Sequence, residues 1–299
     1  MVKPSSLFKP EHARYWIVLA VASVSTAAIL IKLSDAHPMA IAFWRLLIAW
    51  TLLLPFSIAG LLRSRERPSR MDVLLMVGVG LVLAVHFTAW IWSFQTTKVS
   101  SSVLLVTTHP VFVAAMSIYL FKEKVGKIAF AGMGIALFGS AILVLADLGI
   151  SGETIVGDSL ALLGSLMAGI YLLAGSRLRT RVSLGTYVNV VYGSSFLFLL
   201  AGILVLGIDP VQTDPVEYLI FAGLAIGPMI LGHTLYNWTL KYVSPTVVSV
   251  SLLGEPVGST LLAIVFLDEF PWPGFYIGAP LVLAGIYLVS LRSQGTGSE

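Results

Sequence analysis

Few side chains in this sequence could carry chemistry, and they lie inside long apolar stretches. Arg45 could bind an anionic group such as a carboxylate, although snorkelling to the headgroups or pairing with an intramembrane acceptor explains it equally well. Glu255 is the only acid deep in an apolar stretch, so it is a candidate proton carrier, unless it only hydrogen-bonds within its own helix. Histidine can shuttle protons or bind ligand. The candidates for proton coupling are Glu255, His109 and His233, and His86 is a candidate for lining a cavity.

Aromatic residues accompany these polar groups. Trp90 lies one helical turn after His86, so the two share a face. A cavity with aromatic walls and few polar anchors suits aromatic or cationic organic solutes. For most of the aromatic residues in the spans, packing between helices is an equally good explanation. The full set of candidate cavity residues is His86, Trp90, Trp44, Arg45, Tyr171, Tyr192, Tyr236 and Asn237.

The sequence lacks the marks of a metal site, a cofactor site or an enzyme. It contains no cysteine, and no two of the intramembrane histidines are four residues apart, so a metal site is not indicated. There is no phosphate loop, dinucleotide glycine pattern, GxSxG or HExxH, so we expect no cofactor and no use of ATP. Thr107 and Thr108 do not share a helical face with His109, which disfavours an intramembrane lipid-processing enzyme.

The stretch that carries these residues occurs twice, and the copies are offset by 146 residues. Five pairs of residues lie at this spacing: Trp92 and Trp238, Pro110 and Pro256, Glu123 and Glu269, Gly132 and Gly278, and Gly139 and Gly285. Twice 146 is 292 of the 299 residues, so the duplication would form the whole chain.

The composition is that of a polytopic membrane protein. Hydrophobic residues make up 57% of the chain, charged residues 11%, and the mean hydropathy is +0.93. Ten segments are long enough to cross a bilayer: 15–33, 39–62, 71–94, 100–121, 127–146, 157–177, 184–206, 217–240, 246–266 and 273–291. The first is too long for a signal peptide and pairs with residues 161–179, so we expect a retained span. The sequence therefore predicts an all-α integral membrane protein of ten transmembrane helices.

The positions of lysine and arginine predict the orientation. Fifteen of the 18 lie in loops on one side, two lie on the other, and Arg45 lies within a span. The basic side is therefore cytoplasmic, together with both termini, and a bacterial cytoplasmic (inner) membrane is the expected location. Each copy has five spans, so the second must be inverted. The predicted divisions are a tail 1–14, a first repeat 15–146, a linker 147–156, a second repeat 157–291 and a tail 292–299.

Two prolines at equivalent positions predict a helix kink, or a compensated break, in both copies. Pro110 and Pro256 each remove a backbone hydrogen bond inside a predicted span, so the helix must kink there or be compensated. A hinge that moves during function and a static kink are both compatible with this. Spans 100–121 and 246–266 are rich in small and hydroxyl residues, and we expect them to contact each other.

The chain resembles the drug/metabolite transporter superfamily, in its EamA-type ten-span branch. The features that carry the resemblance are the repeat of five spans, the segment AFWRL at 42–46, the serine-rich span before Pro110, Glu123, Gly254-Glu255-Pro256 and Glu269. The resemblance implies a central cavity between the first four spans of each repeat, with the fifth spans peripheral, and export of small metabolites. Within the family the chain is most similar to YddG-type amino-acid exporters, which include carriers of aromatic amino acids. His109 stands where Glu255 stands in the second copy, so the halves are not chemically equivalent.

We therefore expect a secondary-active exporter of small metabolites, with amino acids (aromatic ones included) as cargo, working by alternating access. The alternatives are an exchanger of other metabolites, a multidrug cation exporter, a lipid-processing enzyme, or a sensor subunit, for which the chain has no sizeable soluble domain. The expected partners are a small-molecule substrate, the lipid bilayer and, as a candidate coupling ion, the proton. Nucleic acid is not expected, because the basic residues lie in short loops. The oligomeric state is open, and a monomer is compatible with the sequence.

Overall fold

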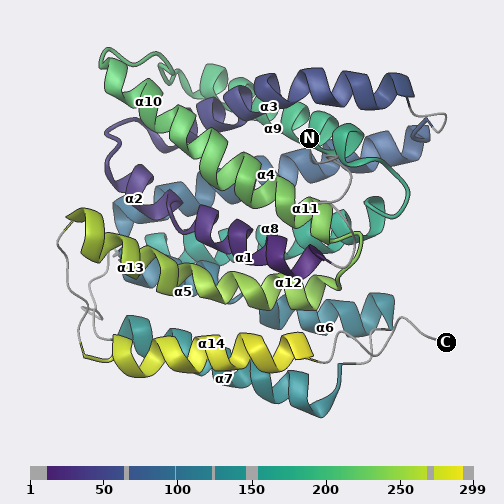
Figure 1. Cartoon of the computed structure of the whole chain (residues 1–299). Coiled ribbons are helices and arrows are strands. Elements are labelled where there is room, and N and C mark those ends of the chain that lie inside the picture. The colour runs from purple at the N-terminus through teal and green to yellow at the C-terminus, as the bar shows by residue number, and fades with distance from the viewer. Residues whose placement is uncertain are drawn as a thin grey trace, which may run out of the picture.

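The computed structural model describes residues 12–63, 67–97, 99–122, 125–145, 154–267 and 273–291, and these residues form helices without any strand (Figure 1). The helices of the first half are α1 (Ala13–Val24), α2 (Ala27–Lys32), α3 (Pro38–Arg63), α4 (Arg70–Thr96), α5 (Val99–Val106), α6 (His109–Phe121) and α7 (Lys127–Leu145). Those of the second half are α8 (Thr154–Leu178), α9 (Leu184–Leu206), α10 (Pro215–Leu224), η3 (Ala225–Thr234), α11 (Leu235–Thr239), α12 (Pro245–Ser251), η4 (Leu252–Gly254), α13 (Glu255–Leu267) and α14 (Phe275–Leu291). Most of the predicted linker 147–156 and of the two tails lies outside the described residues.

Long apolar helices dominate the bundle. Seven helical segments among the described residues are long and apolar enough to cross a membrane, which confirms the expected integral membrane protein. The other three predicted spans, 100–121, 127–146 and 273–291, contain shorter apolar helices, His109–Leu120, Lys127–Gly139 and Tyr276–Val289.

Several spans that the sequence predicts as continuous are interrupted. Pro110 and Pro256 lie in the first turn of α6 and α13, so within the predicted spans each proline stands just after a break in the helix. Proline is tolerated in a first turn because the N–H that it lacks has no helical partner there. In the break before α6, Thr108 Oγ1 donates to Leu105 O at 2.7 Å, which satisfies a backbone carbonyl within the apolar region. The span of α10 to α11 contains a π-helical segment, η3, with Pro228 inside it.

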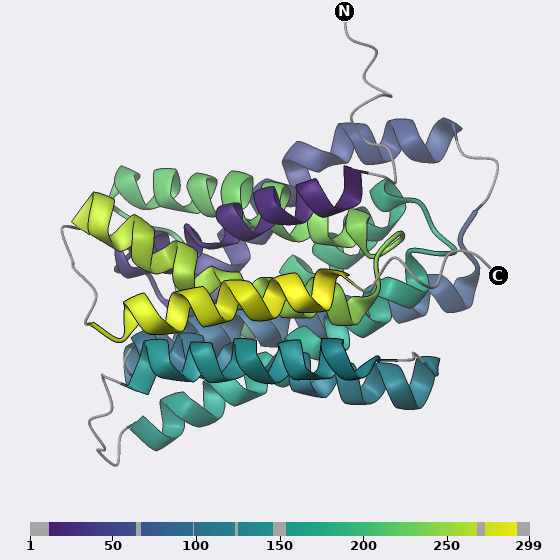
Figure 2. The same ribbon diagram turned by 60° about the horizontal axis from the view of Figure 1, so that its bottom comes forward.

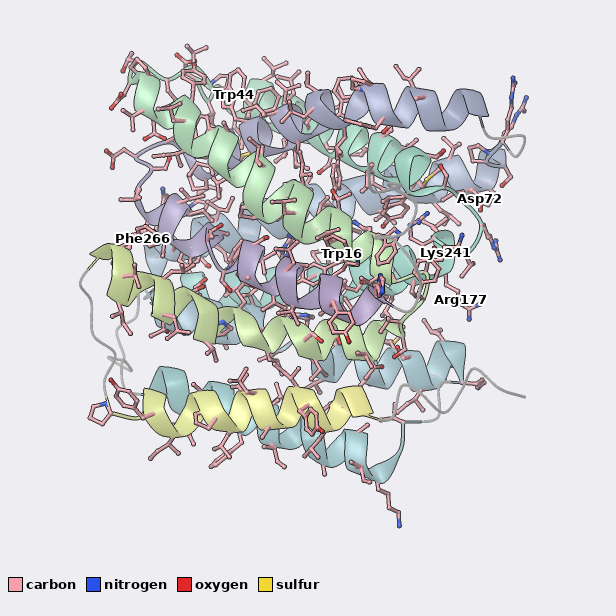
Figure 3. All side chains as sticks on the ribbon, viewed as in Figure 1. Trp16, Trp44, Asp72, Arg177, Lys241 and Phe266 are labelled. Carbon is pink, nitrogen blue, oxygen red and sulfur yellow. The ribbon has the colours of Figure 1, made fainter. Side chains whose placement is uncertain are left out.

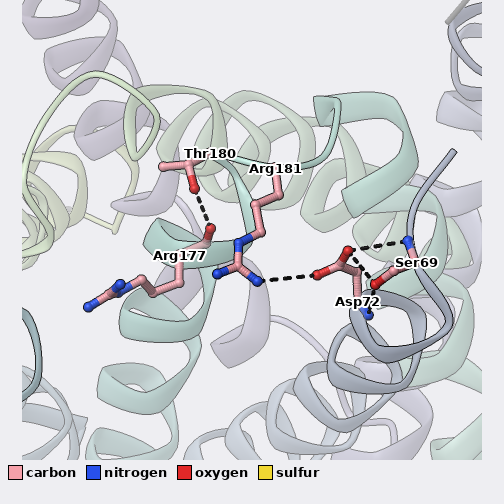
Figure 4. Close-up of polar contacts among 5 residues, drawn as sticks. All are labelled: Ser69, Asp72, Arg177, Thr180 and Arg181. Carbon is pink, nitrogen blue, oxygen red and sulfur yellow. Dashed lines mark hydrogen bonds and ion pairs between the residues drawn. The ribbon is translucent and has the colours of Figure 1, made fainter. Parts of the chain in front are cut away.

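The two ends of the bundle differ in charge. Figure 3 places Asp72, Arg177 and Lys241 at one end, which we call the basic end, and Phe266 toward the opposite end. Arg181 Nη1 lies 3.8 Å from Asp72 Oδ1, and Ser69 caps α4 by accepting from Asp72 N at 3.1 Å (Figure 4). Because the Arg181 side chain is 66% exposed, this ion pair contributes little stability and mainly positions the turn after α8 beside the start of α4.

α7 and α14 pack together at one side of the bundle through glycines (Figures 1 and 2). A Cβ at Gly132 would lie 2.9 Å from Gly285 O, and a Cβ at Gly139 would lie 2.8 Å from Gly278 O. Residue numbers rise on one helix as they fall on the other, so the two helices are antiparallel. The two contacts are also reciprocal, because Gly278 and Gly285 lie 146 residues after Gly132 and Gly139.

We predict that Gly139→Ala destabilises the protein by about 1–3 kcal/mol, because the new methyl group forces the two helix backbones apart. Gly134→Ala is the matched control, since a Cβ at Gly134 on the same helix meets nothing within 4 Å. Thermal melting in detergent, followed by size-exclusion chromatography of the remaining folded protein, measures the difference. Equal melting temperatures for the two variants would show that the glycine contact does not determine the packing.

Candidate functional site

A cavity of about 470 Å³, counting the solvent-open part, lies at the centre of the bundle. Six residues predicted from the sequence line it, and they come from both halves of the chain: Arg45 on α3, His86 and Trp90 on α4, His109 on α6, His233 on η3 and Glu255 on α13. The structure thus brings together all three candidates for proton coupling and three of the eight candidates for lining the cavity.

Arg45 is fully buried, so it does not snorkel to the headgroups. Its guanidinium carbon lies 3.9 Å from the centroid of the Phe87 ring, a cation–π contact. Nη2 has a long contact of 3.9 Å with Met229 Sδ, while Nε and Nη1 have no hydrogen-bond partner among the described residues. A buried guanidinium with free donors is the group in this cavity most able to bind an anion.

His86 and Trp90 form one aromatic wall. Their rings are stacked, with centroids 6.1 Å apart and planes 13° apart, as the shared helical face predicts. His86 Nδ1 lies 2.8 Å from Gly164 O, and because a carbonyl only accepts, Nδ1 carries the hydrogen. Trp90 Nε1 is a buried donor without a partner among the described residues.

His109 and Glu255 occupy equivalent positions in the two copies and line the same cavity. His109 Nδ1 lies 3.0 Å from Val106 O and therefore donates to it, so a neutral ring leaves Nε2 as an acceptor, and this atom has no described partner. Glu255 is 8% exposed, and it interacts electrostatically with Arg45. Buried polar atoms are normally hydrogen-bonded, so several without a partner around one cavity indicate a place for ligand or water.

Five predicted cavity residues lie elsewhere. Trp44 packs against Tyr218 toward the end opposite the basic end, and its Nε1 donates to Pro210 O at 2.8 Å (Figure 3). Tyr171, Tyr192, Tyr236 and Asn237 are buried but are not among the residues that line the cavity. For these five residues the interpretation as packing between helices accounts for what the structure shows.

Four buried residues form a hydrogen-bonded cluster toward the basic end of the bundle, which we call the polar seal: Tyr171, Arg179, Tyr192 and Asn237. Asn237 Nδ2 donates to Tyr171 Oη at 2.5 Å, and the Tyr192 hydroxyl lies 3.1 Å from Thr234 Oγ1. Arg179 Nε donates to Asn237 O at 3.0 Å and Nη1 donates to Val182 O. Because α8 ends at Leu178 and α11 at Thr239, Tyr171 and Asn237 stand close to the basic end of their helices.

The sequence analysis did not identify Arg179, or Phe87 and Met229, which contact the Arg45 guanidinium. Arg179 counted as one of three arginines in a basic loop, yet it is only 3% exposed, and burial lowers the pKa of its guanidinium to about 10. No feature of the loop distinguishes it from its exposed neighbours Arg177 and Arg181. Phe87 and Met229 looked like ordinary apolar residues. Pro228, inside an apolar span, was a visible signal of the irregular segment η3.

A model of the EamA-like transporter family matches this chain twice, over residues 13–145 and 155–291. The chain belongs to the EamA-like transporter family. It is therefore a multi-pass membrane protein of a transporter family, consistent with its apolar helices.

Individual relatives agree with this membership. The chain is 24% identical over 293 residues to an uncharacterized transporter of Archaeoglobus fulgidus, covering 95% of this chain and 98% of the relative. It is also 24% identical over 211 residues to a probable terminal-alkyne amino-acid exporter of Streptantibioticus cattleyicolor, covering 70% of this chain and 69% of that protein. A solved crystal structure matches with a TM-score of 0.77 at 20% identity, over 96% of this chain and 99% of the other, which shows a shared fold.

We predict that Tyr171→Phe loosens the polar seal, because it leaves one donor hydrogen of Asn237 without its partner. The chain has no cysteine, so Ala168→Cys on the cavity wall gives a single labelling site. In proteoliposomes, labelling by an impermeant maleimide added from the basic end should rise about fivefold, the effect of one ordinary hydrogen bond.

Tyr187→Phe is the matched control for this substitution. Tyr187 is buried in the same region, and its hydroxyl has no hydrogen-bond partner among the described residues. Its removal should leave the labelling unchanged. An equal rise in both variants would mean that the seal depends on packing rather than on the bond from Asn237 to Tyr171.

Proposed function

We propose that this protein is a secondary-active exporter of small metabolites, with amino acids (aromatic ones included) as its cargo, working by alternating access. The observation that carries the proposal is the Arg45 guanidinium, which lines a central cavity and has two nitrogen atoms without a described partner. A carboxylate matches the fork of N–H donors that a guanidinium presents. The stacked His86 and Trp90 rings offer an aromatic surface to the rest of the molecule.

Contacts between equivalent residues support two inverted repeats, 15–146 and 157–291. Phe87 and His233 are 146 residues apart, and their ring centroids lie 5.2 Å from each other. The glycine contacts of α7 with α14 have the same reciprocity, and α6 contacts α12 as expected for the fourth and ninth spans. Such contacts occur where a twofold axis relates two halves, and carriers of this kind bind cargo near that axis.

The proposed function also requires an orientation of the protein in the membrane and hinges at which its helices can move. We propose ten spans, as the apolar segments of the sequence indicate. The charge bias supports a cytoplasmic location for the basic end and for both termini, and the bacterial inner membrane is the proposed location. The helix breaks before Pro110 and Pro256 adjoin cavity residues, which supports these sites as hinges. Protons remain candidate coupling ions through Glu255, His109 and His233.

The exporter of Streptantibioticus cattleyicolor supports amino acids as cargo, and with them the YddG-type specificity. An exporter of organic cations is the second candidate, favoured by Glu255 beside an aromatic wall. An exchanger of phosphorylated metabolites would need several cations, and Arg45 is the one arginine or lysine among the described residues that line the cavity. A lipid-processing enzyme is less suited, because His109 Nδ1 faces a backbone carbonyl rather than a hydroxyl.

We predict counterflow of amino acids in proteoliposomes that contain only this protein. Vesicles loaded with unlabelled amino acid should accumulate labelled phenylalanine, threonine or glutamate above the level in protein-free vesicles. Dependence of the flux on a pH gradient would direct attention to Glu255 and the histidines. The absence of flux for every amino acid, with protein shown to be folded, contradicts the amino-acid proposal and favours a test with organic cations.

We also predict that Trp90→Ala or His86→Ala lowers transport by about tenfold or more, because each removes part of the cavity wall while distant packing remains intact. Trp44→Ala is the control, since Trp44 packs outside the cavity. Rates are normalised to folded protein, measured by size-exclusion chromatography. Wild-type rates in the Trp90 and His86 variants would contradict the assignment of this cavity as the cargo site.

A further inference from the structure

Two ionisable side chains of opposite sign share the central cavity. Arg45 is fully buried on α3, Glu255 is 8% exposed on α13, and both side chains line the cavity. They come from different halves of the chain, so the fold rather than local sequence brings them together. Each acts electrostatically on the other.

The two charges do not neutralise each other by direct contact. Nε and Nη1 of Arg45 have no partner among the described residues, and Nη2 has only Met229 Sδ at 3.9 Å. No hydrogen bond or ion pair joins Arg45 to the Glu255 carboxylate in the part of the chain that the structure describes. A buried guanidinium without a hydrogen-bonded partner is costly, so Arg45 has unused capacity to bind an anion. A cation bound beside Glu255 would in turn stabilise the ionised form of its carboxyl group.

We propose that Arg45 and Glu255 bind the two poles of one zwitterion, Arg45 its carboxylate and Glu255 its ammonium group. This inference rests on the proposed function and narrows its substrate class to free α-amino acids. It gives Glu255 a direct role in binding cargo, beyond that of a proton carrier. The stacked His86 and Trp90 rings then face the side chain of the amino acid.

Charge balance gives the physical reason for this selectivity. A zwitterion adds no net charge to the cavity and supplies a partner to each buried charge. A carboxylic acid without an amino group leaves Glu255 unpaired, and an amine without a carboxylate leaves Arg45 unpaired. A site built to pair a polar group discriminates strongly against the analogue that lacks it.

His109 strengthens the subsite for the ammonium group. An ammonium has three N–H donors, which is more than one carboxylate oxygen satisfies. The Nε2 atom of neutral His109 is an acceptor without a described partner, and it lies in the same cavity as Glu255. The two residues stand at equivalent positions of the two copies, so they approach the cavity from opposite halves.

The test compares three probes that share a phenyl ring and differ in their charged groups: L-phenylalanine, 3-phenylpropionate and 2-phenylethylamine. Each competes with labelled phenylalanine for counterflow in proteoliposomes at neutral pH. In the wild-type protein, phenylalanine should compete at concentrations at least about 30-fold lower than either analogue, the usual effect of leaving a buried charge unpaired.

Two substitutions should change this preference in opposite ways. Glu255→Gln keeps the shape of the side chain, and it should abolish the advantage of phenylalanine over phenylpropionate while keeping its advantage over phenylethylamine. Arg45→Gln should abolish the advantage of phenylalanine over phenylethylamine while keeping its advantage over phenylpropionate. Asp209→Asn and Lys241→Met, at exposed positions outside the cavity, are the matched controls and should keep the wild-type order of the three probes.

The outcomes separate this inference from the proposal on which it rests. If wild-type protein moves phenylalanine but Glu255→Gln weakens phenylalanine and phenylpropionate equally, Glu255 does not bind the amino group and the inference is overturned, while amino-acid export stands. If folded wild-type protein moves no amino acid, the proposed function itself fails. Glu255→Gln is close to isosteric, so it decides the question even where Arg45→Gln lowers the yield of folded protein.

Discussion

The burial of Arg45 is the constraint on which the centre of this protein depends. An unpaired guanidinium in an apolar bundle is costly, and the fold offsets that cost without giving it a conventional ion pair. The Phe87 ring covers one face, Met229 lies near one nitrogen, and the charge of Glu255 acts across the cavity. Helices α3, α4, η3 and α13 must therefore meet around one point, and this point is the cavity.

Irregular helices supply the remaining polar groups of the cavity. His109 follows the break at the end of α5, Glu255 follows the 3-10 turn η4, and His233 lies in the π-helical segment η3. Irregular backbone within a membrane is tolerated where it is buried in protein or lines a cavity, because the freed carbonyls then find partners. Here threonine and serine hydroxyls provide some of those partners, as Thr108 does for Leu105. The same breaks that place the polar groups also leave these spans less rigid than continuous helices.

The sequence predicted the charged residues of the site better than its aromatic ones. An arginine or glutamate in an apolar span has few acceptable places, so Arg45 was a candidate for the cavity and Glu255 for proton coupling, and both line the cavity. A tyrosine or tryptophan packs well almost anywhere, and its partner decides its position. Trp44 is held by Pro210 O and Tyr171 by Asn237, contacts that span 166 and 66 residues and leave no local pattern. The repeat spacing did not predict the glycine contact between α7 and α14, because symmetry relates pairs of contacts and does not fix either one.

The two ends of the bundle close with different chemistry, although the copies match in length. At the repeat spacing of 146, Tyr171, Tyr192 and Asn237 of the polar seal correspond to Ser25, Leu46 and Ile91, which are small or apolar. In the proposed alternating-access mechanism, two identical inverted halves would give inward-open and outward-open states of equal energy. These substitutions remove that equality, because Asn237 Nδ2 donates to Tyr171 on one side, whereas the equivalent Ser25 bonds instead to the backbone of Glu255 and accepts from Ser259. In that mechanism the two states therefore differ in free energy, and cargo or protons must supply the difference for one of the two movements.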